Sequence, residues 1–123
     1  MKSKEALTRQ CKYLFDEFLT NNKKYKTLAH FRRSPGGYLV MLKIFENYFS
    51  DKDIHVEELI RLIPITTNSR LSLFSLIDIA VKKNILIKSG DTGDHRKKLV
   101  TPSEIFINEF REWLTDLGWV LSK

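Results

Sequence analysis

The side chains best suited to chemistry in this sequence form two groups in its second half. The first group offers hydroxyl, amide and guanidinium side chains, and its members are Thr67, Asn68, Ser69, Arg70, Ser72 and Ser75. The second follows a glycine-rich turn and consists of Asp94, Arg96, Lys97 and Lys98. Cations bind phosphate, whereas hydroxyl, amide and guanidinium groups form hydrogen bonds with the edges of bases. The two groups therefore offer the chemistry of nucleic-acid recognition.

Catalytic and metal-binding motifs are absent from the sequence. The single cysteine, Cys11, forms no internal disulfide, and together with three scattered histidines it lacks the spacing of a zinc site. We find no nucleophile elbow, phosphate loop or metalloprotease motif. The adjacent acids Glu57 and Glu58 suit a helix start, where carboxylates oppose the macrodipole. We therefore expect neither an enzyme nor a bound cofactor or metal ion.

Positive charge is concentrated in two parts of the chain, which has a formal net charge of +6. Residues 1–35 hold nine Lys and Arg against three acids, and residues 66–100 hold seven against three. Such segments suit phosphate binding, although a basic surface alone predicts a nucleic-acid partner only weakly. The order of the structural elements has to carry the rest of the argument.

Length and hydropathy predict one folded domain in the cytoplasm. A chain of 123 residues has room for one hydrophobic core. The first residues lack the apolar core of a signal peptide, and the longest apolar stretch, residues 38–42, is far too short to cross a bilayer. We therefore expect a cytoplasmic, nucleoid-associated protein with no membrane partner.

Hydrophobic spacing predicts a mainly α fold with a small β-hairpin. A first helix spans about residues 4–28, and a second begins at Pro35 with Ser34 as its N-cap. Ile54 is expected to lie in a short strand. Two helices follow, one opening at His55–Glu58 and stopped by Pro64, and one after the polar turn 65–69. The β-prone runs are 85–87 and 99–100, and Thr101 is the expected N-cap of the last helix, with Pro102 at its first position.

Two short helices joined by a polar turn are typical of a helix-turn-helix, and a hairpin after them is a wing. The sequence thus predicts a winged helix-turn-helix with N- and C-terminal dimerisation helices, in a single domain spanning 1–123. Its parts are the N-terminal helix and basic loop in 1–33, the winged helix-turn-helix in 34–101 and the C-terminal helix in 102–123. The residues at the N-terminal end of the helix after the polar turn 65–69 would form hydrogen bonds with bases.

Two segments resemble the MarR family of DNA-binding proteins. Residues 80–88, Ala-Val-Lys-Lys-Asn-Ile-Leu-Ile-Lys, resemble the end of the family's recognition helix, with Asn84 where glycine is usual. Residues 94–101, Asp-His-Arg-Lys-Lys-Leu-Val-Thr, are similar to its wing signature. The resemblance implies that Arg96 reaches toward the minor groove and that Asp94 maintains the shape of the wing. Lys97 and Lys98 would add phosphate contacts.

The terminal helices carry more apolar surface than one small domain consumes. The residues that we expect at a dimer interface are Leu7, Leu14, Phe18, Phe106, Phe110, Trp113 and Leu117. Together with the resemblance, they predict a homodimeric, sequence-specific transcriptional regulator whose partner is double-stranded DNA.

Two other functions fit the same residues. The winged helix could be a protein-interaction module, or the chain could be a phage or plasmid accessory DNA-binding protein. The sequence leaves open the operator, repression or activation, dimer geometry and chromosomal or phage origin. A small-molecule effector and redox sensing at Cys11, which some MarR relatives perform with a cysteine in this helix, are open as well.

Overall fold

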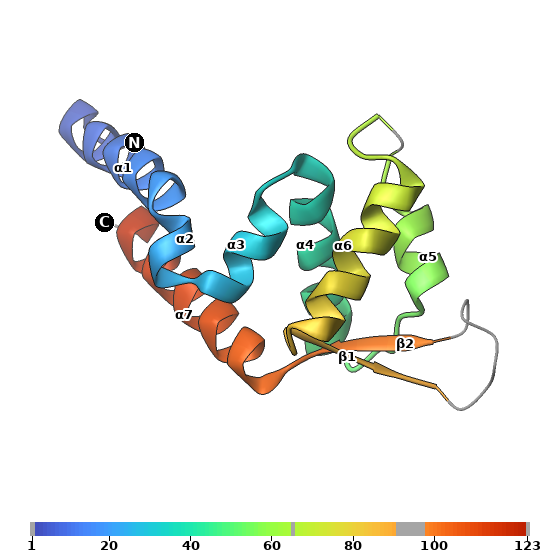
Figure 1. Ribbon diagram of the computed structural model, residues 1–123. Helices are drawn as coiled ribbons and strands as arrows, with labels where there is room; N and C mark the ends of the chain where they lie inside the picture. The colour runs from blue at the N-terminus through green and yellow to red at the C-terminus, as the bar shows by residue number, and fades with distance from the viewer. Residues whose placement is uncertain (1, 65, 91–97, 123) are drawn as a thin grey trace.

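The computed structural model describes residues 2–64, 66–90 and 98–122 (Figure 1). Within these ranges the chain is mainly helical, with one antiparallel two-stranded hairpin. The elements are α1 (Lys4–Leu19), α2 (Asn21–Lys24), α3 (Lys26–Arg32), α4 (Pro35–Phe49), α5 (Val56–Arg61), α6 (Arg70–Lys82), β1 (Leu86–Ser89), β2 (Leu99–Pro102) and α7 (Glu104–Ser122).

The N-terminal region is three helices where the sequence predicted one. α1 ends at Leu19, and the hydroxyl of its C-cap, Thr20, donates to the carbonyl oxygen of Asp16 at 2.8 Å. The sequence predicts one helix over about residues 4–28, but the structure buries Tyr25, Leu28 and Phe31 in the core while most of α1 stays exposed. Most apolar side chains of α1 face solvent, whereas those of residues 25–31 face the core. A single straight helix could not do both, so the chain bends between them.

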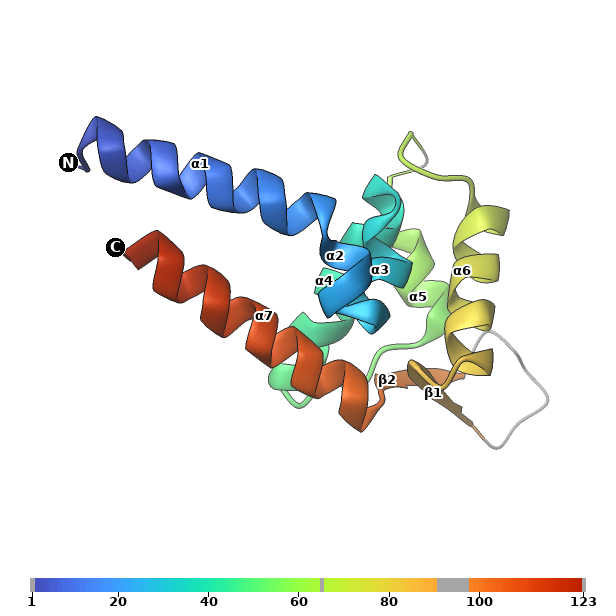
Figure 2. The same ribbon diagram turned by 60° about the vertical axis from the view of Figure 1, so that its left-hand side comes forward.

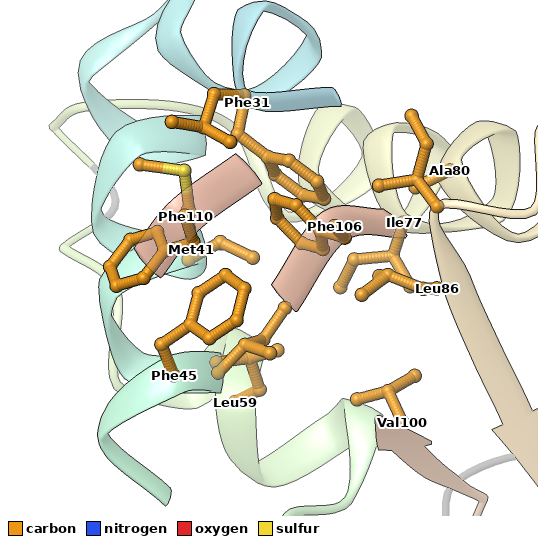
Figure 3. Packing of buried hydrophobic residues seen from close by; sticks show 14 of the residues in the cluster. Phe31, Met41, Phe45, Leu59, Ile77, Ala80, Leu86, Val100, Phe106 and Phe110 are labelled. Carbon is orange, nitrogen blue, oxygen red and sulfur yellow. The ribbon is translucent and has the colours of Figure 1, made fainter. Parts of the chain in front are cut away.

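The aromatic core joins α3, α4 and α7. The rings of Phe31 and Phe106 stack with centroids 5.2 Å apart, and those of Phe45 and Phe110 stack at 3.8 Å (Figure 3). α4 begins as the sequence predicts, with Pro35 in its first turn and the Ser34 hydroxyl accepting from the Gly37 amide at 3.1 Å. α5 and α6 pack against the same core through Leu59, Leu73 and Ile77, so the core fixes their position.

Residues 54–56 pair with the hairpin. Leu86 of β1 lies opposite Pro102 of β2, and Ser89 lies opposite Leu99. On the other edge of β2, His55 forms an antiparallel bridge with Leu99, flanked by hydrogen bonds that residues 54 and 56 make with residues 100 and 98 at 3.2 and 3.0 Å. The pairing lies beside Ile54, where the sequence predicted a short strand, but it is a single bridge at His55 and not a strand.

α7 begins two residues later than the sequence suggested. The Ser103 hydroxyl, and not Thr101, accepts from an amide of the first turn, that of Phe106, at 3.3 Å. Thr101 and Pro102 belong to β2, where Pro102 faces Leu86. Extended pairing with β1 therefore outweighs the local helix-start signal of the Thr-Pro dipeptide.

Three of the predicted interface side chains lie inside one chain. Phe106, Phe110 and Trp113 are buried in the core, because the aromatic residues of α3 and α4 cover that face of α7, and Leu117 packs partly against them. This corrects their assignment to a dimer interface. In contrast, the predicted residues of α1, Leu7, Leu14 and Phe18, are exposed.

α1 and the C-terminal half of α7 extend from the body side by side, and both termini lie at the same end (Figure 2). The Gln10 amide donates to the carbonyl oxygen of Leu121 at 3.3 Å, and the Lys2 ammonium donates to the same oxygen. We call this pair of helices the arm. No helix in the described ranges has both the length and the apolar character needed to span a membrane.

Candidate nucleic-acid interface

α5, α6 and the hairpin lie together on the side of the molecule away from the two termini, in both views (Figures 1 and 2). The turn between α5 and α6 leads directly into the N-terminal end of α6, where the sequence places most of the predicted base-contacting residues. The geometry of this turn decides which of them are free to contact a ligand.

Three of the predicted contact residues form the turn itself. The Ser69 hydroxyl caps α6 by accepting from the Ser72 amide at 3.0 Å. The Thr67 hydroxyl donates to the carbonyl oxygen of Pro64 at 2.7 Å. The side-chain oxygen of Asn68 accepts from the amide of Gly36 on α4 at 2.9 Å, and its amide nitrogen lies 3.4 Å from the Ser72 hydroxyl. These residues therefore position α6 against α4.

The remaining predicted residues of α6 face solvent. Arg70, Ser72 and Ser75 are exposed, and a guanidinium nitrogen of Arg70 donates to Oε1 of Glu57 on α5 at 2.8 Å. Leu71 is 80% exposed. Sequence reasoning missed the Glu57 partner and the turn-building role of Asn68. The capping role of Ser69 could have been predicted, because serine is a preferred N-cap residue directly before the first turn of a helix.

The hairpin is described only at its base. Asp94, Arg96 and Lys97 lie outside the described residues. The backbone carbonyl of Lys98 accepts from the Val56 amide at 3.0 Å, which fixes where β2 begins. The ammonium of Lys88 on β1 lies 3.4 Å from a carboxylate oxygen of Asp78, so β1 is also linked to α6.

A second candidate surface is the apolar side of the arm, which we call the arm face. Its exposed residues are Leu7, Leu14, Phe15, Phe18 and Leu19 on α1 and Leu114, Trp119 and Leu121 on α7. Cys11, on the same helix, is exposed too. Exposed apolar side chains gathered on two neighbouring helices are typical of an interaction site.

Polar contacts attach the arm to the body. Arg32 of α3 makes a bidentate ion pair with Glu17 of α1, at 2.5 and 2.8 Å, and both side chains are almost fully buried. On the other side, Tyr25 and Lys24 both donate to Oδ2 of Asp116 on α7, at 2.7 and 3.1 Å. These donors lower the pKa of Asp116. Burial is the main cause, and the hydrogen bond to Asp116 the second, of a rise in the pKa of Tyr25 to about 12.

Comparison of the chain with family models, with curated proteins and with solved structures finds no match. Within the described ranges, no group of three or more His, Cys, Asp or Glu side chains is placed to hold a metal ion. The functional argument therefore rests on the geometry of the two candidate surfaces.

Proposed function

We propose that this chain is a winged helix-turn-helix DNA-binding protein of MarR-like type that regulates transcription as a homodimer. One observation carries the proposal: Ile54 and His55, between α4 and α5, and the amide of Val56 at the start of α5 pair with β2 and with Lys98 just before it. A winged helix consists of a first helix, a short strand that pairs with the hairpin, two helices joined by a turn, and the hairpin. The order of elements from α4 to β2 follows that plan.

In the proposed complex, the N-terminal end of α6 enters the major groove. Arg70, Ser72 and Ser75 reach base edges, and the exposed Leu71 meets a thymine methyl group. Arg70 leaves Glu57 at little cost, because exposed ion pairs contribute at most about 1 kcal/mol. Arg96 of the wing reaches toward the minor groove.

Lys97 and Lys98 bind phosphates in the same complex, and Asp94 braces the wing. Two copies join through the arm face, which offers apolar surface at the end of the molecule opposite the hairpin. A twofold dimer presents two α6 helices to successive major grooves, so that the half-sites lie about 10 base pairs apart. The protein then acts on the chromosome in the cytoplasm.

Selection of bound duplexes from a random DNA pool tests this function. We expect enrichment of a near-palindromic site, and affinity that falls steeply with salt because cations on the protein displace counterions from DNA. Absence of enrichment together with undetectable binding of duplex at low salt would show the proposal to be wrong.

A second function, a protein-interaction module, is favoured by one feature of α6. Leu71 and Ile79 are both exposed on this helix, and the nearby Asp78 pairs with Lys88. Such a face suits a groove of another protein better than it suits phosphates. Undetectable or salt-insensitive duplex binding, combined with the loss of a protein partner in a Leu71→Glu variant, would favour this function over the first.

A further inference from the structure

A basic pocket lies between α3 and the C-terminal end of α6, outside both surfaces described above. Its volume is about 400 Å³, and its lining includes Lys26, Ala29, His30, Arg33, Lys83 and Ile85. α6 has 13 residues, which places its two ends about 20 Å apart. The pocket is therefore well separated from the N-terminal end of α6, to which we assign the base contacts.

Uncompensated positive charge distinguishes this pocket. Lys26, Arg33 and Lys83 line it, no carboxylate does, and none of the three cations has an ion-pair partner within the described part of the chain. The C-terminal ends of α3 and α6 each contribute roughly half a negative charge. These helix ends offset only part of the charge of the three cations, and a concave surface concentrates the remaining positive potential.

His30 forms the inner wall of the pocket. It is 7% exposed, and Nε2 lies 2.9 Å from the carbonyl oxygen of Leu76 on α6, so Nε2 carries the proton and donates. Burial lowers the pKa of His30 and outweighs the hydrogen bond to the Leu76 carbonyl, which raises it, and the charges of Lys83 and Arg33 lower it as well. The imidazole is therefore neutral at neutral pH and adds no charge of its own.

The remaining polar group of the lining is already paired. The hydroxyl and amide of Thr27 both donate to Oε1 of Glu109 on α7, at 2.7 and 3.1 Å. Thr27 therefore has no side-chain proton left for a ligand. The three cations are the groups that remain available.

We propose that this pocket binds a small oxyanion carrying more than one negative charge, such as a phosphate-bearing or polycarboxylate molecule, between Lys26, Arg33 and Lys83. The guanidinium of Arg33 can bind two oxygens at once, and the lysines act as point charges. Ala29 and Ile85 provide an apolar floor for the rest of such a molecule. Because Arg33 follows α3 and Lys83 follows α6, the bound anion would hold the ends of the two helices together.

Titration of the full chain with inorganic phosphate, at constant ionic strength, tests the proposal by calorimetry and amide chemical shifts. We expect saturable binding with the largest shifts at Ala29, His30 and Lys83. The variants Arg33→Gln and Lys83→Gln should each weaken binding about tenfold, because each removes one charge-assisted hydrogen bond. Both side chains are exposed, so the fold should not change, and the circular dichroism spectrum checks this.

Lys12→Gln is the matched control, since Lys12 is an exposed cation on α1 far along the chain from the pocket. Binding that is not saturable, or that weakens equally in Lys12→Gln and Arg33→Gln, would overturn the proposal. Citrate in a parallel titration distinguishes the two kinds of anion, and tighter binding of either supports the site. If phosphate fails to saturate while Arg33→Gln and Lys83→Gln weaken duplex binding, the cluster contacts the DNA backbone and the small-anion proposal is wrong.

His30 supplies an independent readout. An anion between Arg33 and Lys83 offsets the repulsion that these cations exert on the imidazolium. The pKa of His30, followed by the shifts of its ring protons, should therefore rise in saturating phosphate, and rise less in Arg33→Gln. An unchanged pKa at saturation would place the anion elsewhere.

Discussion

Gly36 and Asn68 contact each other across 32 positions of the chain and set the start of α6. A Cβ at position 36 would lie 2.3 Å from the side-chain oxygen of Asn68, so Gly36→Ala should break the 2.9 Å hydrogen bond between them. We expect the free energy of unfolding to fall by about 1–2 kcal/mol, measured by urea denaturation. Asn68→Ala combined with Gly36→Ala should cost less than the sum of the two single changes. Strict additivity would show that the contact contributes nothing.

Arg70 is the residue of α6 on which the proposed base contacts depend most. Arg70→Gln should weaken the binding of the selected duplex about tenfold, because it removes a charge-assisted contact. Fluorescence anisotropy measures the affinity. Lys43→Gln is the control, since Lys43 also pairs with a glutamate, Glu46, but lies on α4. Equal loss in the two variants would indicate a general charge effect and no contact at Arg70.

Tyr25 should titrate at about 12, above its ordinary value of 10.0. A folded-state pKa above the unfolded value means that the phenol contributes stability below pH 10, which is lost as the pH rises toward 12. Asp116→Asn removes the negative charge of the group that accepts the hydrogen bond from the Tyr25 hydroxyl, so the pKa of Tyr25 should fall. It should stay above 10.0, because burial is the larger cause of the shift. Phenolate absorbance, with Tyr25→Phe subtracted, measures the midpoint. An unchanged midpoint in Asp116→Asn would contradict the assignment.

At the scale of elements, the ion pair between Glu17 and Arg32 fixes α1 to α3. Glu17→Ala leaves a buried guanidinium without its carboxylate, and we expect a loss of about 3–5 kcal/mol in the free energy of unfolding. Nε of Arg32 is also buried with no acceptor in the described part of the chain. Glu17→Ala with Arg32→Met should therefore recover most of the loss. Chemical denaturation of the wild type and the two variants measures both effects, and a double variant as unstable as Glu17→Ala would count against this explanation.

Elements with strong local signals could be predicted from the sequence. Ser34 caps α4 as expected, and Asn84 takes the left-handed conformation, with φ of 61°, that ends α6. These features depend on neighbours within a few residues. The break at Thr20 and the extended Pro102 could not be predicted in this way, because burial of Tyr25 and pairing with Leu86 decide them.

The candidate site was predictable to a smaller extent. The exposed face of α6 follows from helical periodicity, so Ser72 and Ser75 face solvent as expected. Asn68 was expected at a base and instead bonds Gly36, a residue that local sequence patterns do not connect to it. The burial of Phe106 likewise depends on which aromatic rings of other helices reach it.

At the scale of the whole molecule, the two candidate surfaces lie at opposite ends. α6 and the hairpin are at one end, and the arm with both termini is at the other (Figure 2). Joining two copies through their arm faces would therefore leave both α6 helices free. This separation makes oligomeric state and DNA contact independently testable.

Leu14→Glu on the arm face should convert the dimer to a monomer, because a carboxylate in an apolar interface loses hydration without gaining a partner. Light scattering coupled to size-exclusion chromatography measures the mass. Leu62→Glu is the control, since Leu62, at the end of α5, is 52% exposed and Leu14 is 43% exposed. A monomeric wild-type chain, or the same mass for both variants, would contradict the arm-face dimer.

The same variant separates dimerisation from DNA contact. A monomer retains one α6 and one hairpin, so Leu14→Glu should bind a duplex with a single half-site as well as the wild type does. Its affinity for the full near-palindrome should fall by at least about tenfold, because the second half-site no longer binds at the high effective concentration that the dimer provides. Moving the half-sites apart by about 5 base pairs turns them to opposite faces of the duplex, and it should weaken the wild type but not Leu14→Glu. If both proteins respond equally to spacing, the two α6 helices are not held in one rigid dimer.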